Sequence, residues 1–280
     1  MLRMKVFYTI ATFREWREGL RGSVGFAPTM GNLHDGHMAC LEYARLSANH
    51  SVVSIFVNPT QFAPTDDFTK YPRTLDDDLR LLKKEGCSAV FVPSVEEMYP
   101  AGASTKVIAG SMANGLEGDF RPGHFDGVAT VCLKLFQIVE PSMVAFGSKD
   151  LQQMRVIEQM IDDFNMPIHL DAIPTCREAS GLALSSRNRY LTPDAKVQAS
   201  QLYRGLQDTL QLVLDGTPPD EAEVTTTKLL EEHGWTVDYL AVRDGATLGQ
   251  VTPASIAIAV LGAAKLNGVR LIDNITRIRG

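Results

Sequence analysis

Apolar and polar positions along the first two-thirds of the chain repeat an order of short apolar runs and longer segments with helical spacing. Apolar runs of strand length lie at 24–27, 51–57, 89–92, 143–146 and 167–173, with a shorter, more exposed run at 104–108. Helical segments are predicted at 10–20, 35–49, 74–82, 126–138 and from the turn at 147–150 to residue 164. A helix between two apolar strands is a βαβ unit, which implies parallel pairing and a right-handed crossover. The pattern therefore predicts an α/β fold built on a parallel sheet, with Thr12 and Thr74 as helix caps.

The character of the chain changes after Pro193. Two amphipathic helices are predicted at 195–214 and 219–232, and three strands at 237–242, 255–261 and 269–272. No glycine turn suited to phosphate recurs in this part. We therefore expect two domains: residues 1–175, which would bind the ligands, and residues 176–280, a smaller α+β domain that would close over the site.

Composition narrows the class of protein. The 280 residues are 45% hydrophobic and 21% charged, as in ordinary globular proteins. The formal net charge of −6 argues against nucleic acid as a partner. The four cysteines are widely spaced, which suits a reducing compartment, and no apolar stretch approaches the roughly 20 residues of a membrane span. The N-terminal residues also lack the apolar core of a signal peptide. We therefore expect a cytoplasmic protein with no membrane partner.

The stretch at 27–37, APTMGNLHDGH, joins the first apolar run to a helix that begins near Asp35. The first turn of a helix offers unpaired N–H groups and a partial positive charge, both suited to phosphate. His34 and His37 would add side-chain donors, and the glycines would let backbone approach a ligand. In isolation, the spacing favours the alternative interpretation, an ordinary strand–turn–helix joint with two incidental histidines. The choice between these two interpretations depends on the other motifs in the chain.

Further candidate segments follow other apolar runs. The loop at 58–62 lies just after a strand, where ligands bind in open α/β sheets. Lys149 lies on a second strand–turn–helix joint, either contacting phosphate or facing solvent. Ser185, Ser186 and Arg187 could offer several donors to a polyphosphate, or could belong to a hinge of ordinary composition.

Two charged segments have simpler interpretations available. Three acids at 76–78 occupy a predicted first helical turn, where they favour the helix dipole, and metal binding is the minor alternative. The segment at 116–125 is rich in glycine and charge, as in a mobile loop over a site or a plain surface connection.

Six motifs together resemble one enzyme family. PTMGNLHDGH, IFVNPTQF, YPRTLDDDL, LEGDFRPGHFDGV, GSKDLQQ and GLALSSRNRYL stand in the order seen in the pantothenate synthetases, within the HIGH-type nucleotidylyltransferases. The resemblance covers nearly the whole first domain, and the weaker pieces AVRDGATL and GVRLIDN extend it into the second. It implies a Rossmann-like, doubly wound parallel sheet with a smaller C-terminal α+β domain.

The resemblance also implies an activity. Family members are acid–amine ligases of pantothenate biosynthesis, which join (R)-pantoate to β-alanine through a pantoyl-adenylate and release AMP and diphosphate. ATP would be a substrate with Mg²⁺, and the protein would be a homodimer. Two alternatives remain: a nucleotidylyltransferase of the same superfamily that acts on another small substrate, and a catalytically weakened nucleotide-binding homologue.

Carried over residue by residue, the resemblance assigns His37 as proton donor, with His34 as its partner and Lys149 as a phosphate contact. Gln61 and Gln153 would hold pantoate. The residues that would bind ATP are Met30, Gly31, Asn32, Leu33, His34, Asp35, Gly36, His37, Gly147, Ser148, Lys149, Asp150, Cys176, Leu184, Ser185, Ser186 and Arg187.

Four positions depart from the family pattern. Ser148 and Ser180 stand where acids are usual, Leu151 replaces an aromatic residue, and Cys176 replaces valine. If only the backbone of Cys176 meets adenine, that change is mild. The loss of two acids could alter loop positioning or the handling of the metal.

Overall fold

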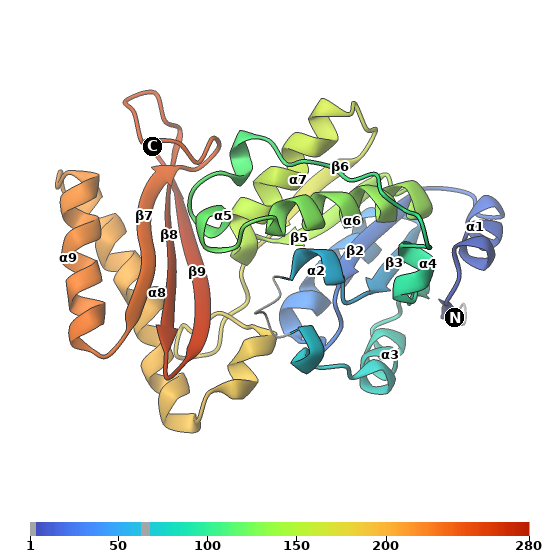
Figure 1. Ribbon diagram of the computed structural model, residues 1–280, viewed down its shortest axis with the longest axis horizontal. Coiled ribbons are helices and arrows are strands. Elements are labelled where there is room, and N and C mark those ends of the chain that lie inside the picture. Colours follow the sequence, from blue (N-terminus) through green and yellow to red (C-terminus); the bar gives the residue numbers. More distant parts are fainter. Residues whose placement is uncertain (1–3, 63–67, 280) are drawn as a thin grey trace. The chain divides into compact units, whose positions relative to one another are not determined.

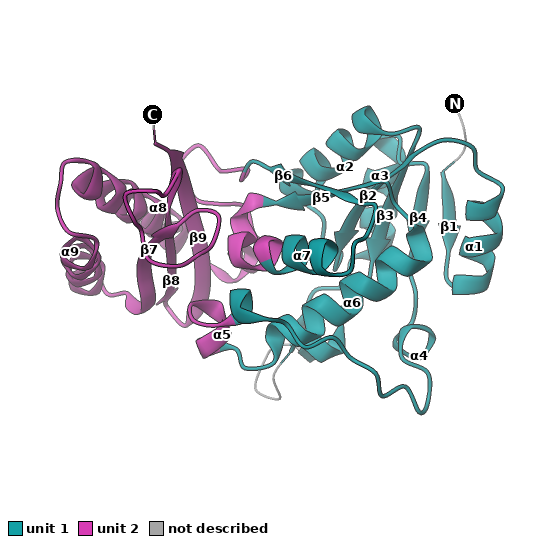
Figure 2. Ribbon diagram, turned by 90° about the horizontal axis from the view of Figure 1, so that it is seen from above, with its two compact units in different colours: residues 1–113, 121–147, 156–174 teal, residues 114–120, 148–155, 175–280 magenta. Residues whose placement is uncertain are grey.

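The structure is a computed structural model that describes residues 4–62 and 68–279 (Figure 1). The chain divides into two compact units, shown in different colours in Figure 2. Unit 1 comprises residues 1–113, 121–147 and 156–174, and unit 2 comprises residues 114–120, 148–155 and 175–280. Within the described part of the chain, no helix is long and apolar enough to cross a membrane.

A parallel sheet forms the centre of unit 1. Its strands are β1 (Lys5–Phe7), β2 (Val24–Thr29), β3 (His50–Ile55), β4 (Ala89–Phe91), β5 (Met143–Gly147) and β6 (His169–Ile173). Their order in the sheet is β1-β4-β3-β2-β5-β6, and every neighbouring pair is parallel. From β2 the chain winds outward through β3 and β4, and then returns to the other side of β2 as β5. The predicted doubly wound, Rossmann-like sheet is confirmed, with its switch point between β2 and β5, where ligands bind in such folds.

Helices cover both faces of this sheet. They are α1 (Ile10–Glu18), α2 (Asp35–Ser47), α3 (Leu75–Lys84), α6 (His124–Val139) and α7 (Leu151–Asp163), the last of which crosses the division between the units; the short helix α4 (Val95–Met98) follows β4. On one face, Leu41 of α2 and Leu82 of α3 pack with Val53 and Val90 of the strands. On the other, Phe13 of α1 contacts Phe91, and Phe136 of α6 contacts Phe26. The four central strands, β2 to β5, are therefore buried on both sides, which explains their continuous apolar runs, whereas the edge strands β1 and β6 are mostly half-buried or exposed.

Three expectations for the first two-thirds of the chain need correction. Residues 104–108 form no strand, because the N–H of Val107 donates to the Thr130 hydroxyl instead of to a neighbouring strand. The cap of α1 is Thr9 rather than Thr12: the Thr9 side chain accepts from the Thr12 N–H. Residues 116–125 are not a continuous loop, because they contain α5 (Glu117–Phe120) and the start of α6.

Unit 2 contains an antiparallel sheet in the order β7-β8-β9, formed by β7 (Thr236–Asp244), β8 (Ala257–Leu266) and β9 (Val269–Ile278). Helices α8 (Pro193–Leu214) and α9 (Pro219–Glu232) bury Leu206 and Leu230 against Val260 of this sheet. The predicted α+β character is confirmed. Strand β9 runs six residues beyond its predicted end, because buried Asp273 and Asn274 interrupt its apolar pattern without interrupting its pairing with β8.

Candidate active site

The histidine turn, residues 30–37, follows the carboxyl end of β2 in unit 1. His34 is the N-cap of α2, and its Nδ1 accepts a hydrogen bond from the Gly36 N–H at 3.2 Å. The Nδ1 of His37 accepts from the His34 N–H, also at 3.2 Å, and the two rings lie 4.1 Å apart between centroids. An Nδ1 that accepts a hydrogen bond carries no proton, so each neutral ring carries its proton on Nε2. The backbone thus sets the tautomer in which both histidines are Nε2–H donors.

Asp78 lies beneath this turn and was given a different role by sequence reasoning. Its side chain is 3% exposed, and its two carboxylate oxygens accept hydrogen bonds from the N–H groups of Asn32 and Leu33, each at 2.9 Å. The Thr74 hydroxyl also donates to the Asp78 carboxylate, and makes no cap bond to α3. Asp76 and Asp77 remain exposed in the first turn of α3, as expected for acids that favour the helix dipole. Asp78 instead holds the histidine turn.

The Gln61 side chain is buried at the end of the short helix at Pro59–Gln61. Its Oε1 accepts a hydrogen bond from Asn58, and its Nε2 lies 3.4 Å from the Met30 sulfur. A Cβ atom at Gly127 of α6 would lie 2.3 Å from the Thr60 carbonyl oxygen, so only glycine lets α6 approach this segment. The neutral Gln61 amide is therefore fixed next to the start of the histidine turn.

Sequence reasoning missed the residues that support Gln61. Asn58 receives a 2.9 Å hydrogen bond from the Tyr99 hydroxyl, and burial raises the pKa of Tyr99, so this phenol stays a donor. The His124 ring contacts the Gln61 carbonyl at 2.9 Å through Nδ1. Asn58 and His124 both stand inside recognised motifs, NPTQF and RPGHFDG, which was the available signal.

Unit 1 thus contains the whole histidine turn, Gln61, and Gly147 at the end of β5. Strand β5 pairs directly with β2, so Gly147 and Met30 follow neighbouring strands at the same edge of the sheet. These are the site residues that the structure brings together in unit 1.

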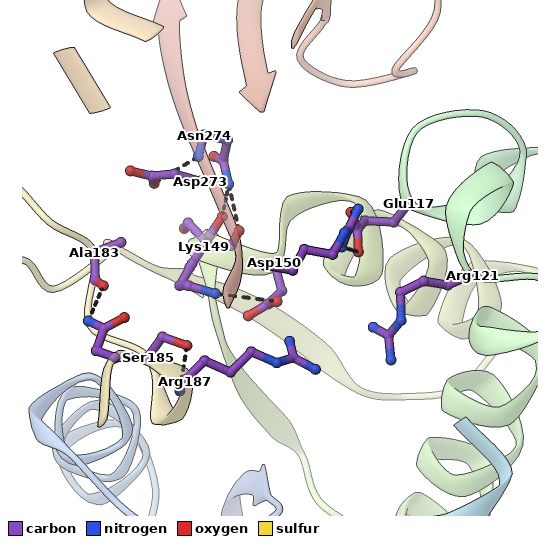
Figure 3. A network of polar contacts seen from close by, with 12 residues as sticks. Glu117, Arg121, Lys149, Asp150, Ala183, Ser185, Arg187, Asp273 and Asn274 are labelled. Carbon is purple, nitrogen blue, oxygen red and sulfur yellow. Dashed lines mark hydrogen bonds and ion pairs between the residues drawn. The ribbon is translucent and has the colours of Figure 1, made fainter. Parts of the chain in front are cut away.

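In unit 2, Lys149 lies on the short helix at Ser148–Asp150, with its ammonium 3.9 Å from the Asp150 carboxylate (Figure 3). Asn274 of β9 holds this turn from the other side. Its side-chain amide donates to the backbone carbonyls of Ser148 at 2.9 Å and Lys149 at 2.7 Å. The predicted site residue Lys149 is therefore positioned by a residue that sequence reasoning did not select, although Asn274 belongs to the GVRLIDN segment.

A small cavity in unit 2 brings several predicted residues together. Lys149, Ser185 and Arg187 line it, along with Asn188 and Arg270. The Ser185 hydroxyl accepts from the Arg187 N–H at 3.2 Å (Figure 3), which shapes the turn that carries both hydroxyl and guanidinium groups. Lys149 and Arg187 give this cavity cationic groups that suit an anionic ligand, whereas Arg270 is paired with Glu117 and Asp238, and the Asp273 carboxylate also lines the cavity.

Cys176, the predicted adenine contact, and Leu184, predicted to bind ATP, lie on a strap of unit 2, residues 176–184, whose two sides are joined by a β-bridge between Arg177 and Ala183. The Cys176 carbonyl accepts a hydrogen bond from the Leu184 N–H at 2.9 Å, so these residues are adjacent. Ser180, at the tip of the strap, accepts a 3.4 Å hydrogen bond from the Leu182 N–H. The serine thus closes its own turn.

Gln153 lies half-buried on α7, next to Gln152. The side-chain oxygen of Gln152 accepts a hydrogen bond from the Glu117 N–H and so holds α5.

A buried ion-pair cluster anchors α5 within unit 2. Arg270 donates two hydrogen bonds to Glu117, at 2.8 and 2.7 Å, and one to Asp238 at 2.6 Å. Burial alone would lower the pKa of Arg270, but the bonds to Glu117 and Asp238 raise it above its ordinary value. Burial beside Glu117 also raises the pKa of Tyr239, whose hydroxyl donates to the same carboxylate. This cluster explains why a charged segment predicted as a loop is partly helical and buried.

The described residues provide no group of three or more histidine, cysteine, aspartate or glutamate side chains that could hold a metal ion. Asp78, the buried member of the acidic run, already accepts three donors. Within residues 4–62 and 68–279, these side chains therefore offer no ready-made site for a resident metal.

Comparison with known proteins agrees with these features. The family model described as Pantoate-beta-alanine ligase matches residues 5–276. A pantothenate synthetase of Acidothermus cellulolyticus is 46% identical, with 97% of this chain and 91% of the relative covered. A crystal structure of pantothenate synthetase from Thermus thermophilus superimposes with a TM-score of 0.91 at 41% identity, covering 97% of this chain and 99% of the other. A pantoate–β-alanine ligase from Francisella tularensis, in complex with β-γ ATP and β-alanine, gives a TM-score of 0.83 at 34% identity, with 97% of each chain covered. The chain therefore belongs to the pantoate–β-alanine ligase family.

Proposed function

We propose that the protein condenses (R)-pantoate with β-alanine to pantothenate at the expense of ATP, through a pantoyl-adenylate, with release of AMP and diphosphate. The family match over residues 5–276 carries this proposal. It is supported by the Francisella relative, whose complex contains an ATP species and β-alanine.

In the first half-reaction, a pantoate carboxylate oxygen bonds to the α-phosphorus of ATP. The bond from that phosphorus to the bridging oxygen breaks, and its electron pair leaves with diphosphate. Because two anions approach each other, donors are needed on the non-bridging oxygens and on the leaving group. The Nε2–H donors of His34 and His37 are suited to this role in unit 1, and Lys149 and Arg187 supply cationic groups from unit 2.

Pantoate is assigned to the two glutamines. Gln61 is buried and oriented by Asn58, which leaves its amide in a fixed direction. A neutral amide orients a carboxylate and hydroxyls without an ion pair that would weaken the nucleophile. Gln153 would provide the second such contact.

The nucleotide is assigned to the remaining residues. The backbone of Cys176 would hold adenine, and Ser185, Ser186 and Arg187 would contact phosphates. Mg²⁺ would arrive as part of the MgATP substrate, in keeping with the lack of a metal-ligand cluster in the described chain.

In the second half-reaction, the amine of β-alanine attacks the activated carbonyl carbon. The carbon–oxygen bond to AMP breaks, AMP leaves with the electron pair, and the amine loses a proton as the amide forms. The acyl-adenylate hydrolyses in water, so solvent must be excluded while it exists.

The test is to follow both leaving groups. Diphosphate release should require pantoate, and AMP release should also require β-alanine. Diphosphate release that is indifferent to pantoate would contradict the proposal. A stable product that retains the nucleotide would favour a nucleotidylyltransferase instead, and nucleotide binding without turnover would indicate a non-catalytic homologue.

We also propose a cytoplasmic homodimer. The four cysteines form no disulfide, which suits a reducing compartment. The dimer rests on the family resemblance, and light scattering of the purified protein would test it: a monomeric mass at micromolar concentration would contradict it.

A further inference from the structure

We propose that Asp78 is a positioning residue for catalysis: its carboxylate holds the histidine turn in the conformation that presents His34 and His37. The proposal rests on the proposed role of this turn in binding ATP. It assigns a function to an acid whose place in the sequence suggested a contribution to the helix dipole or, as the minor alternative, metal binding.

The turn needs such a partner because of its backbone conformation. Gly31 and Asn32 both adopt left-handed angles, with φ of 80° and 51°. In a turn, successive backbone N–H groups can face one side and form a concavity that attracts an anion. In this structure the N–H groups of Asn32 and Leu33 both point to the Asp78 carboxylate, at 2.9 Å. The concavity is therefore filled by an anion from α3.

The groups of the histidine turn therefore have separate functions. The N–H groups of Asn32 and Leu33 are committed to Asp78, so phosphate recognition is left to the histidines and to backbone further along the helix. His34 follows Leu33 directly and caps α2, so the angle at which both rings leave the backbone depends on where Leu33 is held. A displacement of about 1 Å can cost about 10² in rate when catalytic groups depend on orientation.

The Asp78 side chain is itself held in place. It is 3% exposed, and the Thr74 hydroxyl lies 3.2 Å from both of its oxygens. Gly31 packs closely on it, since a Cβ atom there would lie 3.0 Å from Asp78 Oδ2. A carboxylate buried among three donors is a specific anchor, unlike an exposed acid that stabilises a helix end.

The central experiment compares Asp78→Asn with Asp76→Asn in the full-length protein. Both substitutions remove one negative charge from the first turn of α3. Only Asp78→Asn also removes a carboxylate oxygen that accepts a hydrogen bond from the histidine turn. We measure single-turnover, pantoate-dependent diphosphate release over a range of ATP concentrations. Hydrogen exchange at the amides of Asn32 and Leu33, and global unfolding, are measured on the same samples.

We expect Asp78→Asn to slow adenylation at least about tenfold, through both the rate constant and the apparent affinity for ATP. The amides of Asn32 and Leu33 should exchange faster at temperatures where the protein stays folded. Asp76→Asn should leave both quantities unchanged. A merely structural role for Asp78 would lower the unfolding midpoint without changing the adenylation rate of the folded protein, and that result overturns the proposal.

Thr74→Val provides a second variant should Asp78→Asn not fold. It keeps the shape of the side chain and removes the hydroxyl that holds the carboxylate, so a smaller loss, about three- to tenfold, is expected. An unchanged adenylation rate in this variant counts against the proposal.

His37→Ala, measured in parallel, separates the two proposals. If His37→Ala abolishes adenylation while Asp78→Asn behaves like Asp76→Asn, only the role of Asp78 is wrong. If His37→Ala has no effect either, the assignment of the histidine turn to ATP is wrong as well.

Discussion

The side-chain amide of Asn274 donates a 2.7 Å hydrogen bond to the backbone carbonyl of Lys149. It makes a second bond, at 2.9 Å, to the carbonyl of Ser148. Asn274 is 6% exposed and is held in turn by its neighbour Asp273, which forms a buried ion pair with Arg177. The position of Lys149 therefore depends on β9, more than a hundred residues further along the chain.

We predict that Asn274→Asp slows adenylation at least about tenfold, because a carboxylate there repels both carbonyls and the turn that carries Lys149 shifts. Single-turnover diphosphate release is the measurement. Asn267→Asp is the matched control, since Asn267 is exposed in the turn between β8 and β9. Equal rates for the two variants would show that Asn274 does not position Lys149.

His37→Ala should preserve the fold and reduce adenylation by about 10² or more, a typical contribution of a general acid or an electrostatic donor. The loss should appear in diphosphate release, while breakdown of a supplied pantoyl-adenylate by β-alanine is less affected. His169→Ala, an exposed histidine of β6, is the control. Unchanged single-turnover adenylation in the His37 variant would refute its assignment.

The cysteines should differ in reactivity. Burial raises the pKa of Cys87 and Cys132 to about 12, so at about pH 8 these thiols are both covered and protonated. Cys40 is also buried, whereas Cys176 is half-buried. A thiol-alkylating reagent should therefore label Cys176 first, as read by peptide mass spectrometry, and ATP should slow that labelling if the residue meets adenine.

Cys176→Val completes this test. It should remove the fast label and keep catalytic activity, because only the backbone at this position is assigned to adenine. A large rise in the KM for ATP in this variant would show that the thiol itself contributes to binding.

Arg270→Met should destabilise the protein by roughly 3 kcal/mol, because it leaves the carboxylates of Glu117 and Asp238 buried without their cation. Denaturant unfolding is the measurement. Arg243→Met provides the comparison: its ion pair with Glu223 is more exposed, and its loss should cost about 1 kcal/mol or less. Similar losses in the two variants would show that burial of the cluster adds nothing.

Much of the fold was predictable from local pattern. Apolar runs predicted the core strands of unit 1 to within a few residues, because strands covered on both faces carry continuous apolar sequence. The short edge strand β1 was not predicted, and two other differences involve polar side chains with distant hydrogen-bond partners. The Thr130 hydroxyl accepts the hydrogen bond of the Val107 N–H, so no strand forms at 104–108. Buried Asp273 and Asn274 interrupt the apolar pattern of β9, so its second half was not predicted.

The sequence by itself determined the fold class and the family, and it supplied the proposed site residues, because turn, cap and strand preferences are local and the six motifs stand in order. Tertiary structure alone decided which side chains hold those residues in place. Asp78 meets the histidine turn across 46 positions of sequence, and Asn274 meets Lys149 across 125. Such contacts follow from how strands and helices pack. The role of a buried polar group can be assigned only when its hydrogen-bond partners are known.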